Sequence, residues 1–87
     1  MTKKLSEKEL VDILNEAKKL VAVGEMYRHY KGNLYKVIDL GIFSEDIGVG
    51  VIYQAQYGEK VMFIRPLDIW IEDVDCNGRT VPRFDRV

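Results

Sequence analysis

The sequence predicts a mostly β protein of the α+β class, in which an N-terminal amphipathic helix precedes a small antiparallel β-barrel. Two observations predict it. Before Gly24, apolar residues recur at three- and four-residue spacing, which is the helical period. After Gly24, short apolar segments are separated by glycine turns at Gly32-Asn33, Gly58-Glu59 and Asn77-Gly78. Strands joined in this way pair as an antiparallel sheet, and a chain of 87 residues has room for one such domain.

The predicted helix covers residues 7–21. Ser6 followed by Glu9 is a capping box, in which each residue bonds the backbone N–H of the other. The apolar stripe of the helix consists of Leu10, Ile13, Leu14, Ala17, Leu20 and Val21. We expect this stripe to pack on the barrel or on another copy of the chain. The chain then divides into a helical extension, residues 1–23, and a barrel domain, residues 24–87.

If each glycine turn has two central residues, the partners across each hairpin follow by counting. The second hairpin then pairs Tyr53 with Ile64, and its core face is Val51, Tyr53, Ala55, Met62 and Ile64. The third hairpin pairs Glu72 with Arg83 as an ion pair. The remaining predicted pairs are Arg28 with Val37, His29 with Lys36, Tyr30 with Tyr35, Ala55 with Met62, Ile71 with Phe84 and Val74 with Val81.

Composition excludes several kinds of site. The formal net charge of -1 argues against the strongly basic face of a duplex-binding protein. One cysteine, Cys76, and one histidine, His29, can form neither an intramolecular disulfide nor a tetrahedral zinc site. No glycine-rich loop precedes a helix, and no apolar stretch approaches the ~20 residues that span a bilayer. We therefore expect no metal, no cofactor and no membrane association, and a cytoplasmic location.

Four short motifs follow one another along the chain: YRHYKG at Tyr27 to Gly32, Tyr57-Gly58, Arg65-Pro66-Leu67 and Pro82-Arg83-Phe84. In this order and spacing they resemble those of a bacterial family of small proteins, domain of unknown function family 1653. The resemblance runs from Gly24 to the C-terminus and implies an SH3-like β-barrel. It brings no activity with it, since none is assigned to the family.

The best candidate surface is the aromatic and basic hairpin at residues 27–36. Three cations and no acid lie between Met26 and Ile38, so this ribbon could stack on rings and attract an anion. The alternative is structural: tyrosines such as Tyr30 and Tyr35 face the core, and the cations keep a hairpin edge soluble. Arg28 would then pair with Asp39.

A second candidate surface lies on the face of Phe63 and Arg65. Arg65 is either an anchor for a carboxylate or phosphate, or the partner of Asp68 or Glu72. Trp70 is either a recognition anchor or a core residue that covers one end of the barrel.

Catalysis is not expected. His29 is the one side chain that normally titrates near neutrality, but no nucleophile or orienting group accompanies it, and Lys36 would keep it neutral. Cys76 lies close to Asp73 and Asp75, which oppose thiolate formation.

We therefore expect a non-enzymatic protein- or peptide-binding or adaptor module. The alternative is weak binding of single-stranded nucleic acid through the hairpin 27–36. The chain is expected to be a monomer or a small homo-oligomer formed through the N-terminal helix. The predicted binding residues are Tyr27, Arg28, His29, Tyr30, Lys31, Phe63, Arg65 and Trp70.

Overall fold

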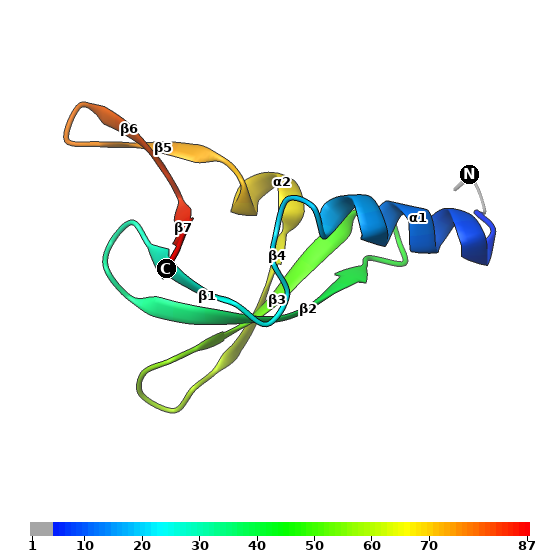
Figure 1. Cartoon of the computed structure of the whole chain (residues 1–87), viewed down its shortest axis with the longest axis horizontal. Coiled ribbons are helices and arrows are strands. Elements are labelled where there is room, and N and C mark those ends of the chain that lie inside the picture. Colours follow the sequence, from blue (N-terminus) through cyan, green and yellow to red (C-terminus); the bar gives the residue numbers. More distant parts are fainter. Residues whose placement is uncertain (1–4) are drawn as a thin grey trace.

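The structure is a computed structural model that describes residues 5–87. Its elements, in chain order, are α1 (Glu7–Ala17), β1 (Met26–His29), β2 (Leu34–Ile42), β3 (Val49–Ala55), β4 (Met62–Pro66), α2 (Leu67–Trp70), β5 (Asp73–Cys76), β6 (Arg79–Pro82) and β7 (Phe84–Arg86). Figure 1 shows α1 at one end of the molecule and the β5–β6 hairpin projecting from the other. The predicted class, one N-terminal helix followed by mostly antiparallel strands, is confirmed.

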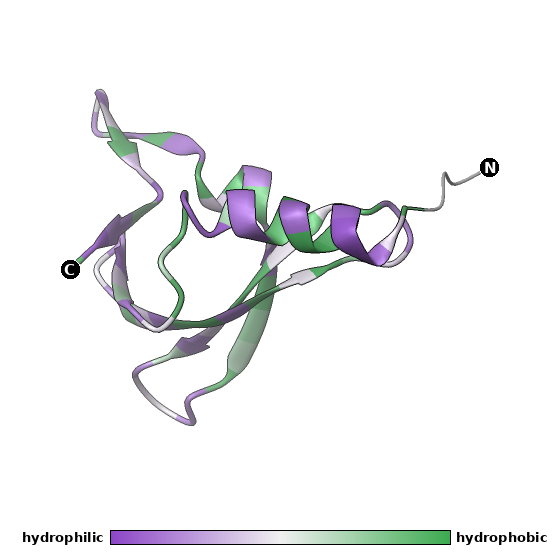
Figure 2. Cartoon of the chain, turned by 45° about the vertical axis from the view of Figure 1, so that its right-hand side comes forward, coloured by the Kyte–Doolittle hydropathy of each residue, from purple (hydrophilic) through white to green (hydrophobic). Residues whose placement is uncertain are grey.

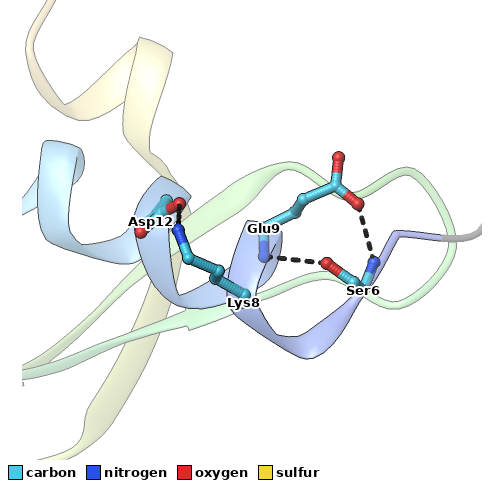
Figure 3. A network of polar contacts seen from close by, with 4 residues as sticks. All are labelled: Ser6, Lys8, Glu9 and Asp12. Carbon is cyan, nitrogen blue, oxygen red and sulfur yellow. Dashed lines mark hydrogen bonds and ion pairs between the residues drawn. The ribbon is translucent and has the colours of Figure 1, made fainter.

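Helix α1 begins where the capping box predicts. The backbone N–H of Glu9 donates to Ser6 Oγ at 3.2 Å, and the N–H of Ser6 donates to Glu9 Oε1 at 2.9 Å (Figure 3). The helix ends at Ala17, earlier than the predicted residue 21. The N–H groups of Lys19 and Leu20 bond carbonyls three residues back, which tightens the last turn. No helix within residues 5–87 is long and apolar enough to span a bilayer.

Five strands form one antiparallel sheet in the order β4-β3-β2-β1-β7, and β5 and β6 form a separate two-stranded ribbon. A bulge between Val37 and Asp39 interrupts the β2–β3 pairing, and such bulges bend a strand. Strands β4 and β7 are the two edges of this sheet. Within residues 5–87 the strand pairs do not close into a ring, and the SH3-like barrel stays a prediction.

The core lies between α1, α2 and the sheet. It contains Ala17, Val21, Tyr27, Val37, Leu40, Val51, Tyr53, Trp70 and Phe84. Trp70 stacks on Phe84 with ring centroids 3.6 Å apart and planes at 5°. Figure 2 shows hydrophobic and hydrophilic residues alternating along α1, as expected for a helix with one buried face. The helix thus shares a core with the sheet, while the predicted boundary at residue 23 stays a prediction.

The register predicted for the first hairpin is wrong. Tyr27, and not Tyr30, lies opposite Tyr35. The His29 N–H bonds the Asn33 carbonyl and the Gly32 N–H bonds the His29 carbonyl, so the loop has three residues, 30–32. Its last residue, Gly32, has φ of +114°, a conformation that favours glycine. The predicted pairs of Arg28 with Val37 and of His29 with Lys36 fail for the same reason.

The register of the second hairpin is wrong by one residue. Tyr53 pairs with Phe63 instead of Ile64, and Ala55 bonds Val61 instead of facing Met62. Because side chains alternate along a strand, this slip moves every β4 side chain to the opposite face. The predicted core residues Met62 and Ile64 are therefore exposed.

The third hairpin follows the prediction near its turn. Val74 pairs with Val81, and Glu72 Oε1 lies 2.9 Å from Nη2 of Arg83. The predicted pair of Ile71 with Phe84 is wrong, because Ile71 caps the C-terminus of α2 and lies outside β5, while Phe84 pairs with His29 of β1.

Candidate binding surface

Aromatic side chains from five strands and the β3–β4 loop meet on one side of the sheet. This aromatic face consists of His29, Tyr35, Tyr53, Tyr57, Phe63 and Phe84, together with Arg65. Tyr35 contacts most of its members edge-on, with ring centroids 5.4 Å from Tyr53 and 5.9 Å from Phe84. Phe63 stacks on Tyr53 at 5.6 Å. Edge-to-face and offset arrangements of this kind are the favourable ones for aromatic rings.

Arg65 of β4 is held in place by two neutral neighbours. Its Nε donates to the hydroxyl of Tyr53 at 3.1 Å, and its guanidinium carbon lies 5.5 Å from the centroid of Phe84. The predicted ion-pair partners do not reach it, since Glu72 pairs with Arg83 instead. Among the ion pairs of residues 5–87, Arg65 takes part in none. A partly buried guanidinium held this way can still receive a carboxylate or phosphate on its terminal nitrogens.

His29 is the last residue of β1 and is close enough to Arg65 for the charge of this arginine to act on its ring. Its Nδ1 accepts a hydrogen bond from the Lys31 N–H at 3.2 Å, and its ring lies 5.0 Å from Phe84. Burial lowers the pKa of His29 below its ordinary value of 6.5, and the positive charges of Arg65, Lys31 and Arg83 lower the pKa further. Burial first, and then the charges of Arg65, Lys31 and Arg83, favour the neutral histidine, whereas Lys36, the neighbour predicted from the sequence, is not among the causes.

Tyr35 and Tyr57 lie edge-to-face on the aromatic face, with ring centroids 5.6 Å apart. Their hydroxyl oxygens lie 2.6 Å apart. Burial and this hydrogen bond raise the pKa of Tyr35 to about 12. The Tyr35 hydroxyl therefore stays protonated near neutral pH and offers a polar atom without charge on the aromatic face.

Residues 25–86 match the model of a family described as Protein of unknown function (DUF1653). The chain belongs to this family. A crystal structure of a DUF1653 protein from Bordetella bronchiseptica is similar to this chain, with 36% sequence identity and a TM-score of 0.69. The similarity covers 78% of this chain and 90% of that chain. No curated protein matches the sequence. The family predicted from the sequence motifs is confirmed, and its description states no activity.

Two of the predicted binding residues of this DUF1653 protein lie in the core. Tyr27 is 7% exposed and Trp70 is 2% exposed. The hydroxyl of Tyr27 accepts a hydrogen bond from the Ala22 N–H at 2.9 Å, and its ring lies 5.5 Å from Trp70. Their assignment to a binding surface is corrected: both stabilise the packing of α1 and α2 on the sheet.

The remaining predicted residues separate into two groups. His29, Phe63 and Arg65 lie on the aromatic face. Arg28 is exposed and donates to the Gly32 carbonyl at 3.3 Å, so the predicted pair with Asp39 is wrong. Tyr30 and Lys31 lie in the β1–β2 turn, where Lys31 Nζ lies 5.9 Å from the ring of Tyr30.

Arg28, His29 and Tyr30 also line a depression of about 400 Å³ between the sheet and the β5–β6 hairpin. Asp85 and Arg86 line it too, so its charges are mixed. The half-buried Cys76 of β5 lies in the same depression. Among the described residues no group of His, Cys, Asp and Glu has the geometry of a metal site.

Sequence reasoning missed the exposed edge of the DUF1653 sheet. Strand β4 is an edge strand, and four consecutive apolar residues are exposed: Val61 51%, Met62 48%, Phe63 40% and Ile64 63%. The wrong register concealed this edge, because it assigned Met62 and Ile64 to the core. The absence of a glycine or charge within the run VMFI was the available signal.

Proposed function

We propose that this DUF1653 protein is a non-enzymatic module that binds another protein or a peptide through the aromatic face, with Phe63 and Arg65 as its principal contacts. The bound segment places an apolar side chain on Phe63 and a carboxylate on Arg65. Aromatic and arginine side chains dominate the energetics of many protein interfaces, which fits this assignment.

One observation carries the proposal: the state of Arg65. Its Nε donates to the Tyr53 hydroxyl and its guanidinium carbon lies 5.5 Å from the centroid of the Phe84 ring, yet it forms no ion pair within residues 5–87. A guanidinium forms strong, often bidentate hydrogen bonds with a carboxylate. Here the guanidinium is already oriented and partly desolvated, although no carboxylate in the described part of the chain pairs with it. A carboxylate of a ligand could therefore bind it at a small entropic cost.

The half-exposed ring of Phe63 supplies the apolar part of the contact. It stacks on Tyr53, whose hydroxyl also accepts the hydrogen bond from Arg65. The same buried tyrosine therefore positions both Phe63 and Arg65. Such rigid, packed anchors lose little conformational entropy on binding.

A capture experiment tests the proposal. The immobilised wild-type protein, the double variant Phe63→Ala/Arg65→Gln and the control Arg79→Gln are exposed to the same cell extract. Arg79 is exposed at the distant β5–β6 hairpin and changes the net charge equally. We expect a set of proteins that wild type and control retain and the double variant loses. An identical set on all three samples, or none on any of them, would contradict the proposal.

The alternative is weak binding of single-stranded nucleic acid through the hairpin 27–36, whose His29 and Tyr35 belong to the aromatic face, since bases stack on aromatic side chains. A mixed oligonucleotide titrated at low salt decides between the two. Trp70 is the one tryptophan and stacks on Phe84, which lies under Arg65, so its fluorescence reports on this surface. Nucleic-acid binding requires a response that falls steeply with added salt.

A further inference from the structure

The hydrogen-bonding direction of β4 follows from its pairing with β3. The Ala55 N–H bonds the Val61 carbonyl, and Tyr53 faces Phe63 two residues along each strand. In an antiparallel pair, hydrogen-bonded and non-hydrogen-bonded residues alternate. Val61, Phe63 and Arg65 therefore direct their backbone groups toward β3, whereas Met62 and Ile64 direct theirs away from the sheet.

This outer edge has few of the devices that usually protect one. Met62 and Ile64 present two N–H and two C=O groups with apolar side chains on both faces of the strand. Charges occur only at the ends of the run, at Lys60 and Arg65, and Pro66 terminates the strand. Edges with neither a central charge nor a bulge readily accept a further strand.

The two faces beside the edge differ. On the side of Ile64, a small apolar hollow of about 130 Å³ lies over Gly41 and Gly50, with Phe43 and Ile52 as its walls. On the other side lie Phe63, Arg65 and the rest of the aromatic face. A strand added along β4 would direct alternate side chains to these two environments.

Charge selects the residue that faces Arg65. The charged groups that act on neighbouring His29 are Arg65, Lys31 and Arg83, all cations. Arg83 is neutralised by Glu72 at 2.9 Å, while Arg65 has no carboxylate within ion-pair distance in residues 5–87. An anionic side chain complements this end of the edge, and a basic one would be repelled.

We propose that β4 receives an extended peptide segment as a sixth strand, with a carboxylate facing Arg65 and an apolar side chain on the opposite face beside Ile64. The inference rests on the proposed function and specifies its partner: an alternating acidic and apolar segment recognised through its backbone. Main-chain hydrogen bonds to Met62 and Ile64 supply affinity, and the two faces supply specificity.

The probe is a blocked synthetic peptide, acetyl-Thr-Ile-Glu-Ile-Phe-Ile-Thr-amide. In an antiparallel alignment its glutamate faces Arg65, its phenylalanine faces Phe63, and the two isoleucines around the phenylalanine bond Ile64 and Met62. Binding is followed by Trp70 fluorescence and by amide chemical shifts. Methylating the backbone nitrogens of those two isoleucines removes the two hydrogen bonds that the probe donates to β4 and keeps the side chains, so we expect affinity to fall at least tenfold. Replacing the glutamate of the probe by lysine should lower its affinity by a similar factor.

Two protein variants form the matched test. Ile64→Pro and Ile64→Thr both lose the isoleucine side chain, but only proline removes the outward N–H. That N–H is not used in the sheet, where proline is tolerated. We expect Ile64→Pro to bind the probe at least tenfold more weakly than Ile64→Thr, with both variants folded by circular dichroism.

The outcomes separate the two ideas. If Arg65→Gln abolishes binding while Ile64→Pro and the methylated probe bind normally, strand addition is wrong and the proposed function stands. If wild type fails to bind the probe at millimolar concentration, strand addition is overturned, and the capture experiment decides the proposed function separately. If wild type sediments as a dimer that Ile64→Pro dissociates, the occupant is a second copy, and the proposed peptide partner is wrong.

Discussion

The Nε of Arg65 lies 3.1 Å from the hydroxyl oxygen of Tyr53, a residue that is buried in the core of the sheet. This bond connects the exposed edge strand β4 to the interior. Tyr53→Phe removes the acceptor and leaves the ring, so we expect a loss of about 1 kcal/mol in the free energy of unfolding. Arg65 also loses its orientation, and the affinity for the glutamate-containing probe should fall several-fold.

Urea denaturation followed by Trp70 fluorescence measures the first effect, and probe titration the second. Tyr30→Phe is the matched control, because the hydroxyl of Tyr30 makes no hydrogen bond within residues 5–87. Equal stability and equal probe affinity for Tyr53→Phe and Tyr30→Phe would show that the bond does not position Arg65.

His29 provides a second prediction, on pH. Its pKa in the folded protein lies below the ordinary 6.5, because of burial and then the charges of Arg65, Lys31 and Arg83. The unfolded chain therefore binds the proton more readily. The contribution of neutral His29 to the free energy of unfolding is complete above pH 6.5 and is lost as the pH falls through the folded-state pKa. Nuclear magnetic resonance titration of the imidazole should show a midpoint below 6.5.

Arg65→Gln should raise that midpoint, because it removes one of the neighbouring positive charges. Lys8→Gln on the exposed face of α1 is the control and should leave the midpoint unchanged. The probe peptide acts in the same direction as Arg65→Gln, since a bound carboxylate favours imidazolium. An unchanged midpoint in Arg65→Gln would show that the charge of Arg65 does not affect the pKa of His29.

The pair of Tyr35 and Tyr57 provides a third prediction, at high pH. The pKa of Tyr35 is raised from 10.0 to about 12 by burial and by the bond to Tyr57. The contribution of protonated Tyr35 to the free energy of unfolding is therefore complete below pH 10 and is lost as the pH rises through about 12. Tyr57→Phe should lower the pKa of Tyr35, as measured from its ring carbon shifts. An unchanged value would assign the whole shift to burial.

Sequence reasoning located the strands of the second hairpin but not their register. Ala55 bonds Val61, so residues 56–60 form the loop, and both Gly58 and Lys60 have positive φ, at 55° and 54°. Glycine marks a turn, but a lysine in the left-handed region has no sequence signature. A loop of five residues in place of two moves the pairing by one, and one residue decides which side chains are buried.

The third hairpin shows the opposite case. Asn77 and Gly78 have φ of 55° and 80°, the conformation that an Asn-Gly turn predicts, so Val74 and Val81 pair as expected. The ion pair of Glu72 with Arg83 also follows, although Arg83 lies beyond the end of β6. The register of a hairpin is thus predictable from sequence where both central residues of the turn favour a positive φ.

The candidate site was predictable only in part, for the same reason. Phe63 and Arg65 can be chosen by residue type, but their neighbours depend on register. The counted register places Tyr53 in the core and Phe84 opposite Ile71, and so does not bring either residue beside Arg65. Tyr27 was chosen for its motif and is in fact buried under α2. Which aromatic side chains of a small sheet face outward is decided by packing among distant segments.

The N-terminal cap provides the last prediction. Ser6 Oγ accepts from the Glu9 N–H at 3.2 Å, and Ser6→Ala removes this acceptor, so we expect a loss of about 1 kcal/mol. Because Ala17 and Val21 belong to the sheet's core, the loss should appear in the single cooperative unfolding transition that Trp70 fluorescence reports. Ser44→Ala, in the β2–β3 loop, is the control and should change stability little. If Ser6→Ala lowered helical ellipticity while the Trp70 transition stayed in place, α1 would unfold separately from the sheet.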